Sequence, residues 1–406
     1  MKRVLLSCYA CQPNRGSEHE VGWQWAINLA AKNKFLVYVI TRTDNKKYID
    51  QSPEILKNNI NFLYVENNIY LKLFTKKGIF LHLYYFFWQL SAFNFIKNKY
   101  GKNYFDIIHH VTFVNFRKVT FLYKLTNNFI YGPVSGGENI PIKLYKCLNF
   151  IEIIQECFRS LLNYLVKFKV IQSKVLKNSK SIYVTTSSSK IFIPKCYFNK
   201  TKVLLAISNT SERDKKNKIY YNDNILRVLF IGTLNNKKGL KILISTIDKI
   251  FIHNKNFKFT IIGTGILEKK FKNFIIQKKL QSFITHIPKV NHESIEDYYF
   301  KNEILFFPSL RESGGMVPLE AISCGLPVIC FNNSSLDEII DNSSGQIIDV
   351  KDKNIHIIIN ECQKSLIKFS KNKNYIYDLS QGAFRRSKNF NWIEKINIVY
   401  ENSTNS

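Results

Sequence analysis

The chain has 406 residues and a formal net charge of +29, with 45% hydrophobic and 22% charged residues. Its length exceeds one ordinary α/β domain and suits two, and its composition excludes an intrinsically disordered chain. The charge is uneven: residues 1–205 hold 30 Lys and Arg against 10 Asp and Glu, whereas residues 206–406 hold 29 against 20. A biased genome composition accounts for part of this excess. A basic N-terminal half also predicts an anionic partner there: a membrane surface, a nucleic acid or an acidic glycan.

The sequence predicts a cytoplasmic protein. The N-terminus leads directly into a short apolar run, which is not typical of a signal peptide. Residues 78–96 come nearest to a membrane span, but three polar side chains interrupt them, which favours a buried or interfacial helix. Cys8 and Cys11 form a C-x-x-C without a second such pair or a nearby His pair, so reduced cysteines that act as small apolar residues are expected rather than a zinc or redox site. Peripheral attachment to the inner face of the cell membrane is a further expectation.

The N-terminal half alternates apolar runs with helical segments, which predicts a parallel α/β sheet. A helix is expected at residues 21–31, between the first two strands. Strands are expected at residues 4–9, 35–41, 61–65, 106–110, 128–131, 181–184 and 202–205. Two basic amphipathic stretches, 71–99 and 143–180, interrupt this series. The first is rich in aromatic and basic residues, so contact with an anionic membrane is expected there.

The C-terminal half predicts a second parallel sheet. Strands are expected at residues 226–231, 258–262, 283–287, 304–307 and 327–331, with helices at 240–250, 267–279, 295–299 and 318–323. This gives an N-terminal domain over residues 1–208, a polar linker over 209–224 and a C-terminal domain over 225–389. A last helix, about 390–406, is expected to pack back on the first domain.

The most informative stretch is residues 306–331, FFPSLRESGGMVPLEAISCGLPVICF. An apolar strand ends there, Pro318 suits the first position of a helix, and Gly325 suits its end. A helix that starts just after a strand presents free backbone N–H groups, which suit an anion.

Two glycines and two carboxylates surround this helix start. Gly314 and Gly315 let the backbone approach a ligand closely. Glu312 and Glu320 offer acceptors for hydroxyl groups on either side of a bound anion, and Glu320 is expected in the first turn. A diphosphate flanked by two sugars is such a ligand.

The pattern PS–x2–E–x2–G–x4–E–A–x2–C–G–x–P–V in this stretch resembles the signature of family 4 glycosyltransferases. These have the GT-B architecture, with two Rossmann-like parallel-sheet domains facing each other across a cleft. ACQPNRGSEHEVGWQWA, DIIHHVTFVNFRK and YGPVSGGE resemble a bacterial polysaccharide-building branch of that family, as do LFIGTLNNKKG and IIGTG. The resemblance implies a retaining transferase that moves a hexose-type sugar from a nucleotide-diphosphate sugar to a glycan or lipid-linked glycan. It implies no metal and no further cofactor.

The resemblance also implies catalytic roles, position by position. Glu312 matches the glutamate that holds donor-sugar hydroxyls and supports the anomeric centre, and Lys238 matches the lysine on the departing diphosphate. A histidine that faces the donor sugar matches His109 or His110, with a slight preference for His110.

Donor-binding roles follow in the same way. Glu320 matches the glutamate on the nucleotide ribose. The segment Gly314, Gly315, Met316 and Val317 matches the backbone that meets the sugar and phosphates. The remaining matches are Gly16 and Ser17 in the loop that closes over the donor, His109 beside it, and Gly232 and Thr233 after the first strand of the second domain.

The chain departs from the family pattern at two positions. Thr233 stands where an arginine is usual, and Lys237 is expected to supply part of the missing charge. Ser334-Ser335 stand where two glycines are frequent. Three alternatives remain: a nucleotide-sugar epimerase of GT-B-like fold, a degenerate non-catalytic subunit, and a basic nucleic-acid-binding protein. Nucleic acid is not expected as a specific partner, because no recognisable binding motif is present.

Overall fold

The computed structural model describes residues 1–15, 17–53, 60–66, 81–166, 170–209, 218–291, 294–333 and 335–401. The chain forms two compact units. Unit 1 comprises residues 1–137, 161–208 and 392–406, and unit 2 comprises residues 138–160 and 209–391. Residues 138–160 belong to unit 2 because Leu144 and Cys147 are buried in its core. Most of the expected linker, residues 210–217, lies outside the described residues.

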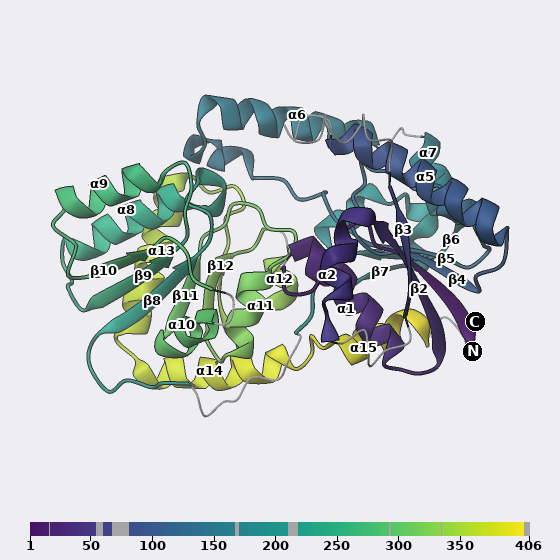
Figure 1. Cartoon of the computed structure of the whole chain (residues 1–406). Helices are drawn as coiled ribbons and strands as arrows, with labels where there is room; N and C mark the ends of the chain where they lie inside the picture. The colour runs from purple at the N-terminus through teal and green to yellow at the C-terminus, as the bar shows by residue number, and fades with distance from the viewer. Residues whose placement is uncertain are drawn as a thin grey trace. The chain divides into compact units, whose positions relative to one another are not determined.

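Unit 1 contains a seven-stranded parallel sheet with the order β3-β2-β1-β4-β5-β6-β7 (Figure 1). Its strands are β1 (Lys2–Ser7), β2 (Phe35–Arg42), β3 (Ile60–Val65), β4 (Ile107–His110), β5 (Phe129–Val134), β6 (Ser179–Val184) and β7 (Thr201–Val203). Each expected strand of this half is present, and β4 and β5 are buried on both faces, as is typical of the centre of a parallel sheet.

Helices cover both faces of this sheet. On one face, α1 (Ser17–Ala30) packs against β2 and against α15 (Trp392–Tyr400). On the other face, α5 (Leu81–Tyr100) and α7 (Val170–Asn178) contribute to one apolar core. The remaining short helices are α2 (Lys46–Asp50), η1 (Thr43–Asn45), η2 (Leu122–Leu125), η4 (Ser188–Phe192) and η5 (Lys195–Lys200). Within the described ranges, no helix is both long enough and apolar enough to cross a membrane.

Unit 2 contains a six-stranded parallel sheet with the order β10-β9-β8-β11-β12-β13. Its strands are β8 (Leu226–Ile231), β9 (Phe257–Ile262), β10 (Ile284–Ile287), β11 (Ile304–Phe307), β12 (Val328–Phe331) and β13 (Gly345–Ile348). The last of these was not expected from the sequence. Both sheets confirm the predicted fold class of two Rossmann-like parallel sheets.

The helices of unit 2 also form two layers (Figure 1). One layer holds α8 (Leu240–Phe251), α9 (Glu268–Gln277) and α13 (Ile355–Ser370), which share a core with the sheet. The other holds α10 (Ile295–Lys301), α11 (Met316–Ser323) and α14 (Lys373–Ser387), with the short α12 (Leu336–Ile339) against α11. Neither α13 nor α14 was expected from the sequence. The segment η3 (Ile142–Cys147) precedes α6 (Phe150–Val166), which begins in unit 2 and ends in unit 1.

The strand order reverses at one point in each sheet: between β1 and β4 in unit 1, and between β8 and β11 in unit 2. Loops at the carboxyl ends of strands that flank such a point diverge and leave room for a ligand. The candidate site residues of unit 2 lie in the loops after β8 and β11 and in the first two turns of α11.

Candidate active site

The loops after β8 and β11 lie in direct contact. The backbone N–H of Leu310 donates to the carbonyl of Lys237 at 2.9 Å. Gly239 closes the first loop with φ of +78°, and a Cβ at this position would lie 1.9 Å from the carbonyl oxygen of Pro308. Only glycine fits this conformation and this approach, so Gly239 lets the two loops meet.

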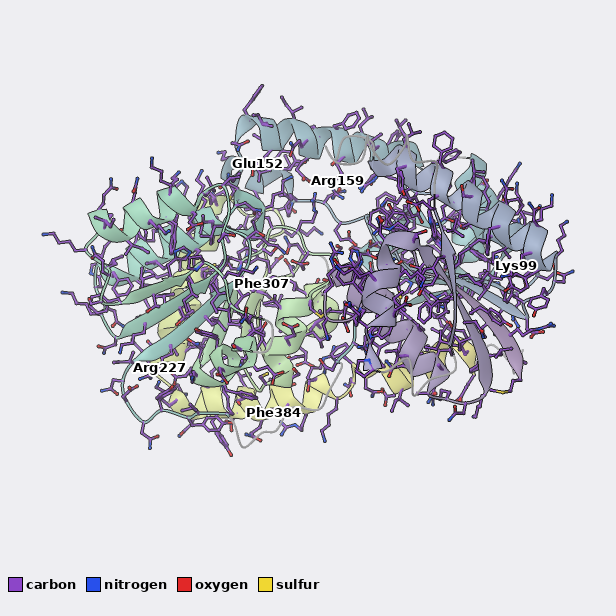
Figure 2. All side chains as sticks on the ribbon, viewed as in Figure 1. Lys99, Glu152, Arg159, Arg227, Phe307 and Phe384 are labelled. Atoms are coloured by element: carbon purple, nitrogen blue, oxygen red, sulfur yellow. The ribbon has the colours of Figure 1, made fainter. Side chains whose placement is uncertain are left out.

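Lys238 and Glu312 form the charged centre of this region. The ammonium group of Lys238 contacts Oε2 of Glu312 and lies 5.5 Å from the ring centroid of Phe307. Phe307, at the end of β11, is labelled in Figure 2. The backbone N–H of Lys238 donates to the side chain of Asn235 at 2.9 Å, which fixes the turn that carries the lysine. Two residues that the resemblance made catalytic are therefore neighbours, although 74 positions separate them in the chain.

Ser335 holds the backbone of Glu312. Its N–H and its hydroxyl both donate to the Glu312 carbonyl, at 3.0 and 3.1 Å. Serine at this position, noted as a departure from the family pattern, therefore supplies a hydrogen bond that glycine lacks. Ser334 lies outside the described residues.

The start of α11 differs from the expectation. The helix begins at Met316 with Gly315 as its N-cap at φ of +68°, so Pro318 is the third helical residue and not the first. Proline tolerates any position in the first turn because its missing N–H would have no partner there. The N–H groups of Met316 and Val317 have no partner within the helix for the same reason. Gly314, in contrast, has open space where a Cβ would be.

Glu320 lies in the second turn of α11, not in the first as expected, because the helix starts earlier. The hydroxyl of Tyr299, a buried residue of α10, donates to its Oε2 at 2.8 Å. The sequence analysis did not identify Tyr299. A buried hydroxyl on one helix that bonds a half-buried carboxylate on another fixes the direction of that carboxylate.

The IIGTG motif lets two loops at the end of the sheet meet. A Cβ on Gly263 would lie 2.0 Å from the carbonyl oxygen of Gly232, and one on Gly265 would lie 2.5 Å from that of Leu234. These glycines therefore position the segment that contains Gly232 and Thr233. Thr233 itself is exposed.

A buried carboxylate on α6 joins three cations of unit 2. Nη1 of Arg311 contacts both oxygens of Glu156, at 2.6 and 2.5 Å, while Lys237 and Arg159 lie 3.3 and 3.2 Å from it. Burial acts to raise the pKa of Glu156, but the three cations outweigh it and hold that pKa below its ordinary value. Lys237, expected to replace a phosphate-binding arginine, already has a carboxylate partner here. Arg311 is a cation beside Glu312 that the sequence analysis missed.

His109 and His110 lie at the end of β4 in unit 1, and both are buried. Nε2 of His109 bonds the carbonyl of Gly132 and its Nδ1 bonds the hydroxyl of Tyr400, each at 2.7 Å. Since a carbonyl only accepts, Nε2 carries the proton and Nδ1 accepts from the tyrosine. Burial lowers the pKa of His109 to about 4, so its ring is neutral at pH 7.

His110 has a different set of partners. Its Nε2 lies 3.1 Å from the hydroxyl of Tyr85 and its Nδ1 lies 3.2 Å from the hydroxyl of Ser7, while its ring stacks on Tyr131. Burial, together with His109 and Lys118, lowers its pKa to about 3. Both nitrogens of each histidine therefore already have partners within unit 1.

A second pair of titratable groups lies at the strand-order reversal of unit 1. The carboxylate of Glu18, in the first turn of α1, accepts from the N–H of Phe113 at 2.8 Å. The ammonium of Lys118 lies 3.0 Å from the ring centroid of Phe113, whose φ of +61° is rare for a bulky residue. Burial raises the pKa of Glu18 and lowers that of Lys118 to about 7. The sequence analysis missed this pair. Ser17 starts the same helix, and Gly16 lies outside the described residues.

Among the residues that the structure describes, no group of three or more His, Cys, Asp or Glu side chains could hold a metal ion. Lys238, Glu312 and the N-terminus of α11 form the candidate donor site of unit 2, and Glu320 is the fifth residue of that helix.

Part of the chain that contains this region is similar to known proteins. Residues 210–379 match the family model "Glycosyl transferases group 1". The chain is 27% identical over 230 residues to an uncharacterized glycosyltransferase of Methanocaldococcus jannaschii. This match covers 54% of this chain and 61% of that protein. It is 26% identical over 261 residues to an uncharacterized 41.2 kDa protein in the cps region of Klebsiella pneumoniae. This match covers 63% of this chain and 68% of that protein.

The fold is also found among solved structures. HepE of Anabaena, solved in complex with UDP, matches 100% of this chain and 100% of its own with a TM-score of 0.58 and 14% identity. The similarity to the HepE structure supports the fold, and the match of residues 210–379 to the family model supports the family. Residues 210–379 therefore belong to the group 1 glycosyltransferase family, and the chain has the GT-B fold.

Proposed function

We propose that the protein is a retaining glycosyltransferase that moves a hexose-type sugar from a nucleotide-diphosphate sugar to a glycan or lipid-linked glycan in surface polysaccharide biosynthesis. The observation that carries the proposal is the contact between Lys238 and Glu312 beside the N-terminus of α11. It joins one cation, one carboxylate and free helix N–H groups at the strand-order reversal of unit 2, which suits an anionic nucleotide with sugars on both sides.

Each group has a task in breaking the sugar–phosphate bond. The departing diphosphate gains negative charge, which the ammonium of Lys238 and the N–H groups of Met316 and Val317 would stabilise. The carboxylate of Glu312 would accept hydrogen bonds from donor-sugar hydroxyls and support the positive charge that develops at the anomeric carbon. The carboxylate of Glu320, directed by Tyr299, would accept from the hydroxyls of the nucleotide ribose.

The acceptor side belongs to unit 1 in this proposal. Glu18 and Lys118 are held close to Phe113 at the strand-order reversal of that unit, and their pKa values move towards neutrality. Groups of this kind are typical of sites that handle protons on hydroxyls. The location of one relative in the cps region supports a polysaccharide acceptor, and the UDP in HepE supports a uridine nucleotide.

The test is a thermal-shift screen of the purified chain against UDP, GDP, ADP and their common sugars. One nucleotide class should raise the melting temperature, because a ligand that binds only the folded state stabilises it. Glu320→Ala should abolish the shift. Tyr299→Phe should weaken nucleotide binding by about fivefold, the equivalent of one hydrogen bond, whereas Tyr298→Phe on the same helix should not.

Three outcomes contradict the proposal in different ways. If no nucleotide shifts the melting temperature, the donor site is degenerate and the chain is a non-catalytic subunit, as Thr233 would suggest. If Glu320→Ala binds nucleotide normally, the donor site lies elsewhere. If a nucleotide sugar is converted to its epimer without any acceptor, the chain is an epimerase.

A further inference from the structure

Helix α6 exposes its apolar side chains. Its large hydrophobic residues are between 45% and 76% exposed: Phe150, Ile151, Ile154, Phe158, Leu161, Tyr164 and Leu165. At about 100° per residue these seven lie within an arc of about 140°, so they form one continuous stripe. We call this stripe the α6 apolar face.

The opposite face of α6 is polar and bonded to the protein. Glu152 accepts from the side chain of Asn236 at 2.8 Å, and Glu156 binds Arg311. Further along, Asn163 accepts from Arg117 at 2.7 Å. Glu152 and Arg159 are labelled on this helix in Figure 2. The usual arrangement of a surface helix, apolar inside and polar outside, is therefore reversed.

This reversal has a cost that a partner would remove. Burial of a large apolar side chain is favourable, and the α6 apolar face leaves seven such side chains about half or more exposed to water. A contiguous apolar surface of this kind marks an interaction site.

The charges around α6 favour an anionic partner. Residues 138–180 contain three acids, Glu138, Glu152 and Glu156, and all three are buried. The exposed charged side chains described in the same segment are lysines: Lys143, Lys146, Lys174 and Lys177. A second copy of the chain would bring the same cations together, in a protein that already carries a net charge of +29. A bilayer with anionic lipids offers both hydrocarbon and negative charge.

We propose that the α6 apolar face docks on the surface of an anionic lipid bilayer. The helix lies in the plane of the interface, with its apolar side chains at the boundary between headgroups and acyl chains and the flanking lysines on lipid phosphates. The expected stretch 71–99 is the less suitable surface, because α5 buries Tyr84, Tyr85 and Trp88 in the core of unit 1. Residues 71–80 lie outside the described residues. The proposal does not depend on donor chemistry.

The test is co-sedimentation of the full chain with phosphatidylcholine vesicles, with and without phosphatidylglycerol, in the absence of nucleotide. The chain should bind when phosphatidylglycerol is present. The double variant Ile154→Glu, Phe158→Glu should lose at least about tenfold in partitioning, because two inserted side chains are replaced by acids. Lys146→Gln should lose about fivefold, as one lysine contributes about 1 kcal/mol near such a surface.

A matched control is Ile276→Glu on α9, since Ile276 is 61% exposed and lies away from α6 in the sequence. It should bind vesicles like the parent chain. The proposal is wrong if the parent chain does not bind, if the double variant binds equally well, or if Ile276→Glu loses as much. It is also wrong if light scattering shows a dimer that the double variant converts to a monomer, because the occupant is then a second copy. Because the substituted side chains are already exposed, each variant should keep the parent's melting temperature.

Discussion

Different residues fix the backbone and the side chain of Glu312. Ser335 bonds the carbonyl, Lys238 contacts the carboxylate, and the N–H of Gly315 lies 3.5 Å from Oε1. An acid with so little freedom is directed at a fixed point, which a loop glutamate on a bare surface is not. The reorganisation needed when a donor binds is then small.

Replacing Glu312 by Gln should lower kcat by about 100-fold or more while nucleotide binding persists. The amide keeps the size of the side chain and removes the negative charge that supports the anomeric centre. The measurement is nucleotide release from the donor sugar identified by thermal shift, together with nucleotide affinity. A variant with near-normal kcat would remove Glu312 from the mechanism, and lost affinity would make it a nucleotide-binding residue instead.

At the scale of elements, the loops after β8 and β11 depend on two glycines of opposite character. Gly239 combines φ of +78° with a Cβ position 1.9 Å from the carbonyl of Pro308, whereas Gly314 has no atom within 4 Å of its Cβ position. The first glycine is required by the fold of unit 2. The second leaves space beside the candidate donor site.

Gly239→Ala should therefore lower the free energy of unfolding by more than about 2 kcal/mol, through the left-handed conformation and the backbone clash. Gly314→Ala should change it by less than about 0.5 kcal/mol, because Gly314 is only half-buried and an added Cβ would meet no atom within 4 Å. Chemical denaturation of both variants measures the difference. If both variants change the free energy of unfolding equally, the close approach of the two loops does not require glycine at position 239.

On the scale of the whole molecule, buried neutral histidines link stability to pH. The pKa of His109 is about 4 in the folded chain and about 6.5 in an unfolded one. Between these values the unfolded chain binds a proton that the folded chain does not, so protons favour unfolding. The contribution is complete above pH 6.5 and is lost as the pH falls towards 4.

We expect the free energy of unfolding to fall between pH 6.5 and 4, and His109→Gln to make this fall shallower while lowering stability at pH 7. Fluorescence of Trp25, whose ring lies 4.9 Å from that of His109, gives a probe close to the site. His253→Gln, on the segment after α8, is the control and should keep the parent slope. An unchanged slope in His109→Gln would show that other groups govern the acid limb.

The sequence located the strands better than the later helices. β8 and β11 match their expected bounds to the residue, because continuous apolar runs between turn residues are hard to misread. The missed strand β13 has only four residues, two of them Gly and Gln, and lies at the edge of its sheet. Signals for the missed α13 and α14 were present: Asn354 and Asn372 cap their first turns by accepting from backbone N–H groups.

The two parallel sheets, the loop of Glu312 and the amphipathic character of residues 143–180 could all be predicted from the amino-acid sequence. Periodicity and turn residues encode such features locally. The bond from Tyr299 to Glu320 and the pair of Arg311 with Glu156 could not be predicted in this way, because folding brings these partners together from separate segments. The tertiary structure also decided that α6 turns its acids inward and its apolar side chains outward. Helical spacing reveals which residues share a face, but the partner packed against the helix decides which face is buried.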